Sequence, residues 1–477
     1  MNRAPNGTVQ FVDEVNGTIH TPVSVATDIL KDLIERVKKA TEMKISRLVV
    51  TIPADFKQEQ RLATKEAIRN AGFSDNEFRI LNEPTAAALA YFVDNPVREE
   101  NIIVYDLGGG TFDCTVIHIV NNRFHILAHD GDEGIGGVLF DKILFDYVMN
   151  YCKQQYGKSP LPDEKHKLYR SKLRKLLNYC EEAKITLSVG YDTEISLSDF
   201  ANQLGVDDDD ELAIHISLSQ LTSLFETDVK KTIAIMDRAL ASAKLQTSDI
   251  SRVLYVGGSC HIKCVKEQIK QHFGGRDVDC HEVHPDEVVA KGACIFSELW
   301  RESKDGNTLL LNNNQPIYID ELTSITLNVQ VSRDLCWPFL EKGKPINGQQ
   351  ITVTFQDKGN TGTTVYNILE GDSDKRCNNV YNYVKDCSLL KSYTIKYAPE
   401  DRGPNGAIEY LFIFSIETDG VISLEIIKYI NLKRNNSLLI LFVFLHIQLS
   451  FQNKSVLKWI FYIFYYNQLY IIQNEIS

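Results

Sequence analysis

Several features that mark other protein classes are absent from the 477-residue sequence. Its ten cysteines form no Cys-x-x-Cys pair, and the polar start Met1–Asn6 shows no signal-peptide pattern. We therefore expect a reducing, cytoplasmic setting, with the nucleus as the alternative. The net charge of −12 argues against a nucleic-acid-binding surface, which is normally basic. No Gly-x-x-x-x-Gly-Lys-Ser/Thr segment occurs, which argues against a P-loop nucleotide site.

The residues that are present indicate a globular protein of several domains. A hydrophobic share of 44% and a charged share of 24% are typical of soluble chains with sizeable cores. Up to residue 303, strands and helices alternate with early antiparallel hairpins, which predicts an α/β domain with a mixed sheet. We interpret residues 304–320 as a linker. Residues 321–427 alternate as strands with Gly, Asn and Asp turns, which predicts an all-β domain.

Residues 428–477 differ in composition from the rest of the chain. The apolar run Leu438–Leu449 is interrupted by His446 and is too short for a transmembrane helix. Residues 451–477 mix Ile, Tyr, Phe, Asn, Lys and Gln without a helix or strand period. We interpret this segment as an atypical, non-native tail, such as read-through of AT-rich sequence. A membrane anchor is the alternative.

The central segment of the chain is a glycine-rich turn between two apolar stretches. A β-branched run ends in Asp106, three consecutive glycines and Thr111 follow, and a second strand begins at about Asp113. Such a turn serves either a plain β-hairpin or a phosphate loop, in which backbone N–H groups converge on an anion. The flanking polar residues favour the phosphate loop. Asp106 is also placed to hold Mg²⁺ through water.

Four segments in a particular order carry a resemblance to a known family. Residues 80–88 read Ile-Leu-Asn-Glu-Pro-Thr-Ala-Ala-Ala, and residues 106–113 read Asp-Leu-Gly-Gly-Gly-Thr-Phe-Asp. Residues 256–259 read Val-Gly-Gly-Ser, and residues 285–293 read Pro-Asp-Glu-Val-Val-Ala-Lys-Gly-Ala. Together they resemble the 70-kDa heat-shock chaperone family, closely up to residue 300 and more loosely to residue 427. The resemblance implies an actin-like (ribonuclease-H-like) ATPase domain over residues 1–303 and a peptide-binding β-sandwich over residues 321–427.

The resemblance also implies a site for ATP or ADP with Mg²⁺. Catalytic roles fall on Asp106, Glu83 and Thr111, and the first two would hold the Mg²⁺ through water. From its position alone, Glu83 is equally an ordinary helix-start carboxylate. The implied nucleotide contacts are Gly108, Gly109, Gly110 and Thr111 at the phosphates, then Gly137, Glu181, Lys184 and Ser188, and on the other wall of the adenosine pocket Gly257, Gly258, Ser259 and Asp286.

The family resemblance implies an ATP-dependent chaperone. Pro53 and Arg61 match positions that the family uses to pass the nucleotide state to the peptide domain. Without the resemblance, Arg61 is equally interpreted as an ordinary surface arginine. The expected partners are unfolded or extended polypeptides, J-domain co-chaperones and nucleotide exchange factors. We expect no nucleic-acid partner and no membrane association.

The sequence departs from the family pattern in the expected ATPase domain. The family's domain is a duplicated lobe with two phosphate hairpins, and no second Asp-Leu-Gly-Thr-Thr-like segment occurs here. The family's catalytic lysine belongs to the same missing part. Because phosphoryl transfer depends on positioned charge, we expect an incomplete domain with impaired hydrolysis and an uncovered sheet edge at residues 48–52. Ile185 also replaces an arginine that packs on adenine.

Other functions remain as alternatives. A catalytically impaired relative would bind peptide, a ribosome or a co-chaperone, while the β-domain disfavours a sugar-kinase-like enzyme. Cys260/Cys264 and His281/His284 have spacings near those of zinc ligands. We disfavour zinc because the two pairs would have to meet from a helix start and a distant strand.

Overall fold

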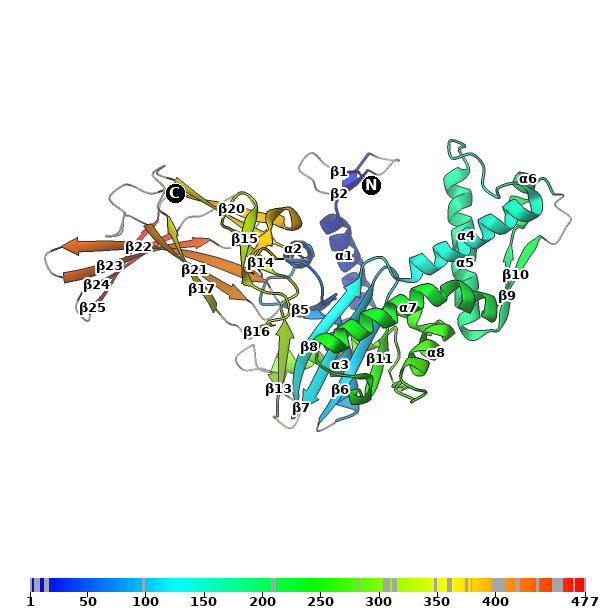
Figure 1. Ribbon diagram of the computed structural model, residues 1–477, viewed down its shortest axis with the longest axis horizontal. Coiled ribbons are helices and arrows are strands. Elements are labelled where there is room, and N and C mark those ends of the chain that lie inside the picture. Colours follow the sequence, from blue (N-terminus) through cyan, green and yellow to red (C-terminus); the bar gives the residue numbers. More distant parts are fainter. Residues whose placement is uncertain are drawn as a thin grey trace. The chain divides into compact units, whose positions relative to one another are not determined.

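The computed structural model describes most of the chain (Figure 1). The described residues are 2–3, 9–12, 17–96, 99–206, 212–281, 283–302, 309–310, 315–346, 350–357, 363–373, 376–378, 380–396, 408–416, 421–434, 437–447, 458–465 and 468–475. They form two compact units. The α/β unit comprises residues 49–55 and 80–319, and the β-rich unit comprises residues 1–48, 56–79 and 320–477.

A mixed sheet forms the centre of the α/β unit. Strands β6 (Glu99–Leu107), β7 (Phe112–Val120) and β8 (Arg123–Asp132) form an antiparallel meander, and β11 (Arg252–Val256) lies parallel to β6. Residues 102–105 of β6 are all buried, as expected for a central strand covered on both faces. The α/β class with a mixed sheet agrees with the prediction from the sequence.

Helices cover this sheet on both faces (Figure 1). Helix α7 (Leu218–Ser242) packs on β7 and β8, and the Tyr105 and Thr232 hydroxyls lie 2.5 Å apart beneath it. Helix α3 (Glu83–Asp94) packs against α9 (Val288–Glu302). The other elements of this unit are α4 (Gly137–Tyr156), α5 (Tyr169–Val189), α6 (Ala201–Leu204), α8 (Lys263–His272), β9 (Asp192–Ser196), β10 (Ala213–Ser217), η1 (Ser198–Phe200), η2 (Thr247–Asp249) and η3 (Gly258–His261).

The sequence pattern predicts helices over residues 86–92 and from about 163 to 187, and the structure begins both elsewhere. Helix α3 begins at Glu83 instead of residue 86, because Pro84 occupies the first turn, where its missing N–H costs nothing. Helix α5 begins at Tyr169 instead of residue 163. Before it, the Asp163 carboxylate accepts the Lys165 N–H at 2.9 Å, which closes a turn in place of a helical start. The acidic run at 207–211 lies outside the described residues.

The expected linker contains paired strand. Residues Leu309–Leu310 form β12, which pairs with β13 (Pro316–Leu322), and β13 lies next to β8 in the sheet. The end of β13 pairs with β16 (Pro345–Ile346). Strands β4 (Leu48–Ile52) and β5 (Phe78–Asn82) form a separate two-stranded sheet.

Helices α1 (Pro22–Thr41) and α2 (Gln58–Asn70) belong to the β-rich unit. Thr21 caps α1 by accepting the Ser24 N–H at 3.1 Å, with Pro22 in the first turn, as the sequence predicts. The Thr27 hydroxyl reaches the Ala67 carbonyl of α2 at 3.4 Å. Short strands β1 (Asn2–Arg3), β2 (Val9–Val12) and β3 (Ile19–His20) form a small sheet.

Two antiparallel sheets make up the rest of the β-rich unit. The first has the order β19 (Asn382–Tyr383), β15 (Leu335–Leu340), β14 (Leu327–Gln330), β18 (Thr363–Glu370) and β20 (Ser388–Lys396), with η4 (Val384–Asp386) before β20. The second has the order β17 (Gln350–Asp357), β21 (Ile408–Ile416), β22 (Ile422–Arg434), β23 (Ser437–Ile447), β24 (Lys458–Tyr465) and β25 (Gln468–Glu475). One apolar cluster joins the sheets, and the Phe339 and Phe414 rings stack at 3.9 Å between centroids.

The sequence pattern predicts strands at 324–332 and 350–356 but none between them, where β15 lies. That segment contains Pro338, which cannot donate to a strand ladder. The structure accommodates this proline with an irregularity in the β14–β15 register at Leu327/Asn328. Residues 451–477, where the sequence shows no helix or strand period, include β24 and β25, and the apolar run from Leu438 lies in β23. Within the described ranges, no helix is both long and apolar enough to span a membrane.

Candidate functional site

The β6–β7 turn is a tight hairpin that ends in acidic residues. Asp106 lies opposite Asp113 in the strand register. The Gly108 N–H donates to the Thr111 carbonyl oxygen at 3.0 Å and closes the turn. The two aspartates therefore lie at the same end of the sheet, beside the glycines.

The middle of the turn is open. Gly109 and Gly110 are exposed, and a Cβ atom built on either would meet nothing within 4 Å. Within the described part of the chain, their backbone N–H groups donate to no protein acceptor. Exposed amides with no side chain in front of them suit a bulky anion such as a phosphate.

The start of helix α4 holds this turn in place. The N–H of Gly137 donates to the Gly108 carbonyl at 3.0 Å, and the N–H of Val138 donates to the Gly109 carbonyl at 2.8 Å. A Cβ on Gly136 would lie 2.7 Å from backbone atoms of Gly110. The sequence Gly136-Gly137 is thus required by close packing of the two loops.

Three carboxyl groups crowd together beside the turn. Burial, and then the nearby carboxylates of Glu83 and Asp113, raise the pKa of Asp106 to about 8. Burial and then Asp113 raise the pKa of Glu83, the first residue of α3, to about 7. Such repulsion is relieved by a proton or a cation, so the group suits Mg²⁺.

A directly ligated metal centre is not built here. In the part of the chain that the structure describes, no three His, Cys, Asp or Glu side chains are grouped to bind a metal ion. A Mg²⁺ ion beside Asp106 would therefore be held largely through water and phosphate oxygens, which is its usual mode. Of the residues considered for zinc, Cys260 is buried and donates to the Val256 carbonyl at 3.0 Å, and the His281 ring lies 3.2 Å from Asp277.

Lys184 connects α5 to the glycine turn of α4. Its amine forms an ion pair with Asp141 at 2.6 Å and donates to the Gly137 carbonyl at 3.2 Å. A Cβ on Gly137 would lie 2.9 Å from the Ser259 hydroxyl and 3.4 Å from the Lys184 amine. The Ser259 hydroxyl donates to the Gly108 carbonyl at 2.9 Å. These bonds place the two predicted walls of the nucleotide pocket next to the turn.

The loop after β11 completes this arrangement. Gly257 has φ +84°, and a Cβ on it would lie 2.5 Å from the Leu107 carbonyl oxygen, so both its backbone angle and its packing require glycine. A Cβ on Gly258 would lie 3.3 Å from the Asp286 carboxylate. Asp286 in turn lies 2.9 Å from the His261 ring nitrogen.

The remaining predicted contacts lie along α5. Glu181 is exposed, while the half-buried Ser188 donates to the Lys184 carbonyl within the helix. Ile185 is 58% exposed, so an apolar side chain is open to solvent at the position where the resemblance predicts a contact with adenine. An exposed isoleucine next to a polar site is suited to packing against a flat base.

The structure thus gathers most of the predicted site around one turn, and it adds two residues. Asp113 was noted as a flanking residue but given no role, although hairpin register alone places it opposite Asp106. Asp141 was missed. Its position in the sequence was the available signal: Asp141 is an acidic residue one turn after Gly137 in α4, and it follows Phe140, which is buried.

Arg61 is not a surface residue. It is 3% exposed on α2, and its side chain donates to the Phe56 carbonyl at 3.0 Å. Gln58, the first residue of this helix, donates to the Ile422 carbonyl of β22 at 3.4 Å. Just before the helix, the Phe56 carbonyl also accepts a hydrogen bond from Ser324, which precedes β14, at 3.0 Å. Pro53 follows β4 in the other unit.

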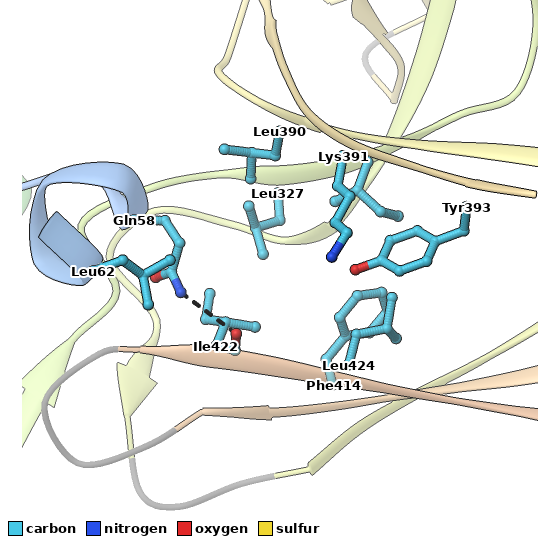
Figure 2. Close-up of a pocket in the computed structure, with 10 residues that line it drawn as sticks. Gln58, Leu62, Leu327, Leu390, Lys391, Tyr393, Phe414, Ile422 and Leu424 are labelled. Atoms are coloured by element: carbon cyan, nitrogen blue, oxygen red, sulfur yellow. Dashed lines mark hydrogen bonds between the residues drawn. The ribbon is translucent and has the colours of Figure 1, made fainter. Parts of the chain in front are cut away.

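An apolar pocket lies between α2 and these sheets (Figure 2). Figure 2 shows Gln58 and Leu62 on one side, with Lys391 and Tyr393 pointing in from β20. The other lining residues are Leu327, Ile368, Leu390, Phe414, Ile422 and Leu424. The Gln58 side-chain oxygen and the Tyr393 hydroxyl are buried there, and neither has a partner among the described residues.

Comparison with known proteins points to one family. The sequence model of the Hsp70 protein family matches residues 1–438. The chaperone protein HscA of Cronobacter sakazakii is 32% identical over 423 residues, which are 88% of this chain and 61% of that protein. The chaperone protein DnaK of Thermosipho melanesiensis is 31% identical over 409 residues, which are 84% of this chain and 63% of that protein.

A plant relative shows the same extent of match. The heat shock 70 kDa protein BIP3 of Oryza sativa subsp. japonica is 30% identical over 409 residues, 85% of this chain and 56% of that protein. The chain therefore spans less than two thirds of the length of these curated relatives.

Proposed function

The chain belongs to the Hsp70 protein family, and from this premise we propose that it is an ATP-dependent chaperone that binds unfolded polypeptide under the control of ATP and ADP. The family implies an actin-like ATPase domain, and the mixed α/β content fits it. The observation that carries the proposal is the β6–β7 turn, where open glycine amides adjoin a crowded group of half-buried carboxyl groups with raised pKa values.

In the proposed site, the amides of Gly109 and Gly110 and the Thr111 side chain bind the β- and γ-phosphates. Asp106 and Glu83 orient the water around Mg²⁺, which neutralises charge on the phosphates. Lys184 keeps Gly137 and the start of α4 in position. Glu181, Ile185, Ser188 and the Gly257–Ser259 loop enclose the adenosine, with Asp286 behind Gly258.

The two sheets of the β-rich unit are the proposed peptide-binding β-sandwich. Their common apolar cluster gives a rigid scaffold, and an extended peptide would add to it through backbone hydrogen bonds and a side-chain pocket. Helix α2, which carries Arg61, contacts this scaffold at Ile422, and Phe56 just before the helix bonds Ser324. In the proposal, this segment passes on the nucleotide state. J-domain co-chaperones, nucleotide exchange factors and a cytoplasmic location complete the proposal.

Calorimetric titration with ATP and ADP in the presence of Mg²⁺ tests the site. Gly109→Ala is the sharpest variant, because its methyl group meets no protein atom but would stand where the phosphates bind. We expect at least a tenfold loss of nucleotide affinity, about 1.4 kcal/mol, with an unchanged melting temperature. The exposed Asp146→Asn variant on α4 is the control and should bind as the parent does.

Phosphate release and peptide binding separate the remaining outcomes. Turnover above the rate of Asp106→Asn would support hydrolysis by this chain. Nucleotide and peptide binding without turnover would instead identify a catalytically impaired relative. The absence of any binding heat at millimolar ATP or ADP would rule out the nucleotide site.

A further inference from the structure

Two cysteines far apart in the sequence meet in the first sheet of the β-rich unit. Cys336 lies on β15 and Cys387 immediately precedes β20, 51 residues later in the chain. Their sulfur atoms are 3.8 Å apart, and both are free thiols. We propose that Cys336 and Cys387 are a redox site, which forms a reversible disulfide by exchange with a low-molecular-weight disulfide such as glutathione disulfide.

The surroundings hold both sulfur atoms in place. The Cys336 thiol donates to the Asn382 carbonyl at 3.5 Å, and Cys336 lies opposite Asn382 in the β15–β19 register. The Asn328 amide reaches the Cys387 sulfur at 3.8 Å while donating to the Gly371 carbonyl at 2.8 Å. Asn328 and Asn382 are themselves bonded side chain to side chain at 2.8 Å.

Glycine at position 371 allows Cys387 to approach this closely. Gly371 has φ +144°, and a Cβ on it would lie 2.9 Å from the Cys387 Cα atom and 3.2 Å from its sulfur. A side chain there would push Cys387 away from Cys336. The pair therefore depends on a specific backbone arrangement, beyond the presence of two cysteines in one sheet.

The two thiols differ in access. Cys336 is fully buried and Cys387 is half-buried, so a reagent in solution meets Cys387 first. Burial, before any other cause, raises the pKa of both thiols, that of Cys336 to about 12. Since the thiolate is the attacking form, the pair is slow to react at neutral pH and should react faster as pH rises.

The reaction follows the usual two steps of thiol–disulfide exchange. The Cys387 thiolate attacks one sulfur of glutathione disulfide, which forms a mixed disulfide and releases one glutathione thiolate. The Cys336 thiolate then attacks the Cys387 sulfur and releases the second glutathione. Two protein thiols are thereby oxidised, one glutathione disulfide is reduced, and the two thiol protons pass to the two glutathione molecules.

The product would join β15 to the start of β20 across the sheet. These strands are separated by β14 and β18 in the sheet order, and the closed loop contains β18, β19 and most of β15. A cross-link over a loop of this length stabilises mainly by restricting the unfolded chain. The oxidised chain should therefore melt at a higher temperature than the reduced chain.

Peptide mapping of the native full chain tests the proposal. The chain is incubated with glutathione disulfide at pH 8.5 or with reduced glutathione, its free thiols are alkylated, and it is digested with trypsin without reductant. Trypsin separates the two cysteines into residues 334–342 and 386–391, and places Cys377 in residues 377–385. We expect a cross-linked peptide of 334–342 with 386–391, lacking two hydrogens, which dithiothreitol separates.

Two variants make the result specific. Cys387→Ser changes only the half-buried partner and should abolish both the cross-link and the oxidation-dependent rise in melting temperature. Cys377→Ser, in the neighbouring peptide, should leave both unchanged. Glutathione retained on Cys387 with no cross-link, or a dominant cross-link through Cys377, would overturn the proposal. So would a parent chain whose thiols all remain alkylable after oxidant treatment at pH 8.5.

Discussion

At the scale of single residues, the carboxyl groups beside the nucleotide turn repel one another, and a bound cation would relieve this repulsion. Glu83 and Asp106 are held with raised pKa values, by burial first and then by neighbouring carboxylates. Between about pH 4 and the pKa values of the folded protein, these two groups therefore keep protons that the unfolded chain has already lost. Stability falls as pH rises through that window and levels off above about pH 8.

Asp106→Asn should remove part of this pH dependence. Without nucleotide or Mg²⁺, we expect the variant to be more stable than the parent at pH 8 by on the order of 2 kcal/mol, and about equal to it at pH 4. Urea unfolding at both pH values measures the free energies. A parent chain that gains stability over Asp106→Asn as pH rises would contradict the assignment, and Asp146→Asn is the exposed control.

Lys184 is expected to be structural as well as a part of the pocket. Its partner Asp141 has a side chain that is 14% exposed, so Lys184→Met leaves a buried carboxylate unpaired. We expect a loss of about 3 kcal/mol in the free energy of unfolding. Lys175→Met on the same helix is the matched control: its pair with Asp199 is 45% and 34% exposed, so its loss should lower the free energy of unfolding far less than Lys184→Met does.

At the scale of elements, the two helices α3 and α9 pack with almost no space between them. Helix α3 is buried on every side from Pro84 to Phe92, and its residues 86–88 are three fully buried alanines. A Cβ on Gly292 of α9 would lie 1.8 Å from the Ala86 carbonyl oxygen, so the helices can approach this closely only at a glycine. The Pro-Asp-Glu-Val-Val-Ala-Lys-Gly-Ala segment is thus partly a packing motif.

Gly292→Ala should therefore destabilise the α/β unit even though alanine favours helices. Overpacking against backbone is expected to cost about 2–3 kcal/mol, seen as a lower urea midpoint. Cys294→Ala, two residues further along α9 and exposed, should change stability by less than about 0.5 kcal/mol. Equal effects of the two variants would show that the contact does not hold the helices together.

Helix α1 shows how tertiary structure can overrule a clear pattern. With Ala26, Leu30 and Ile34 beside them, the apolar positions Val25, Ile29, Leu33 and Val37 recur at helical spacing and predict an amphipathic helix. The last four of these side chains are 37–55% exposed, and the buried residues of α1 are Thr27 and Ile34. The helix and its cap follow from local signals, but the face that packs on α2 does not.

At the scale of the whole molecule, the proposed chaperone cycle requires that nucleotide and peptide affect each other's binding equally. In this cycle, a change of nucleotide would reach the peptide-binding sheets through the bonds of Gln58 with Ile422 and of Phe56 with Ser324. In the pocket of Figure 2, the buried Gln58 oxygen and Tyr393 hydroxyl have no hydrogen-bond partner among the described residues, as suits an interface that rearranges.

Reciprocal titrations test this coupling. The factor by which ATP changes the affinity for an extended apolar peptide should equal the factor by which the peptide changes ATP affinity. Ser324→Ala removes the hydrogen bond to the Phe56 carbonyl and should move both factors toward one, with peptide affinity unchanged in the absence of nucleotide. Ser392→Ala on β20 is the control. The Ser392 hydroxyl donates to the side-chain oxygen of Asn367 at an exposed position, so its loss should leave the factors unchanged.

The sequence by itself determined the features that depend on residues close together in the chain. The glycine turn after Asp106, the Thr21-Pro22 helix start and the Gly257-Gly258-Ser259 loop are local backbone requirements, so they can be read directly. Hairpin register even places Asp113 beside Asp106. Only the tertiary structure decided which distant groups meet, such as Lys184 with Asp141, Gly292 with Ala86 and Cys336 with Cys387. These contacts depend on how helices and sheets pack, and no local propensity encodes that packing.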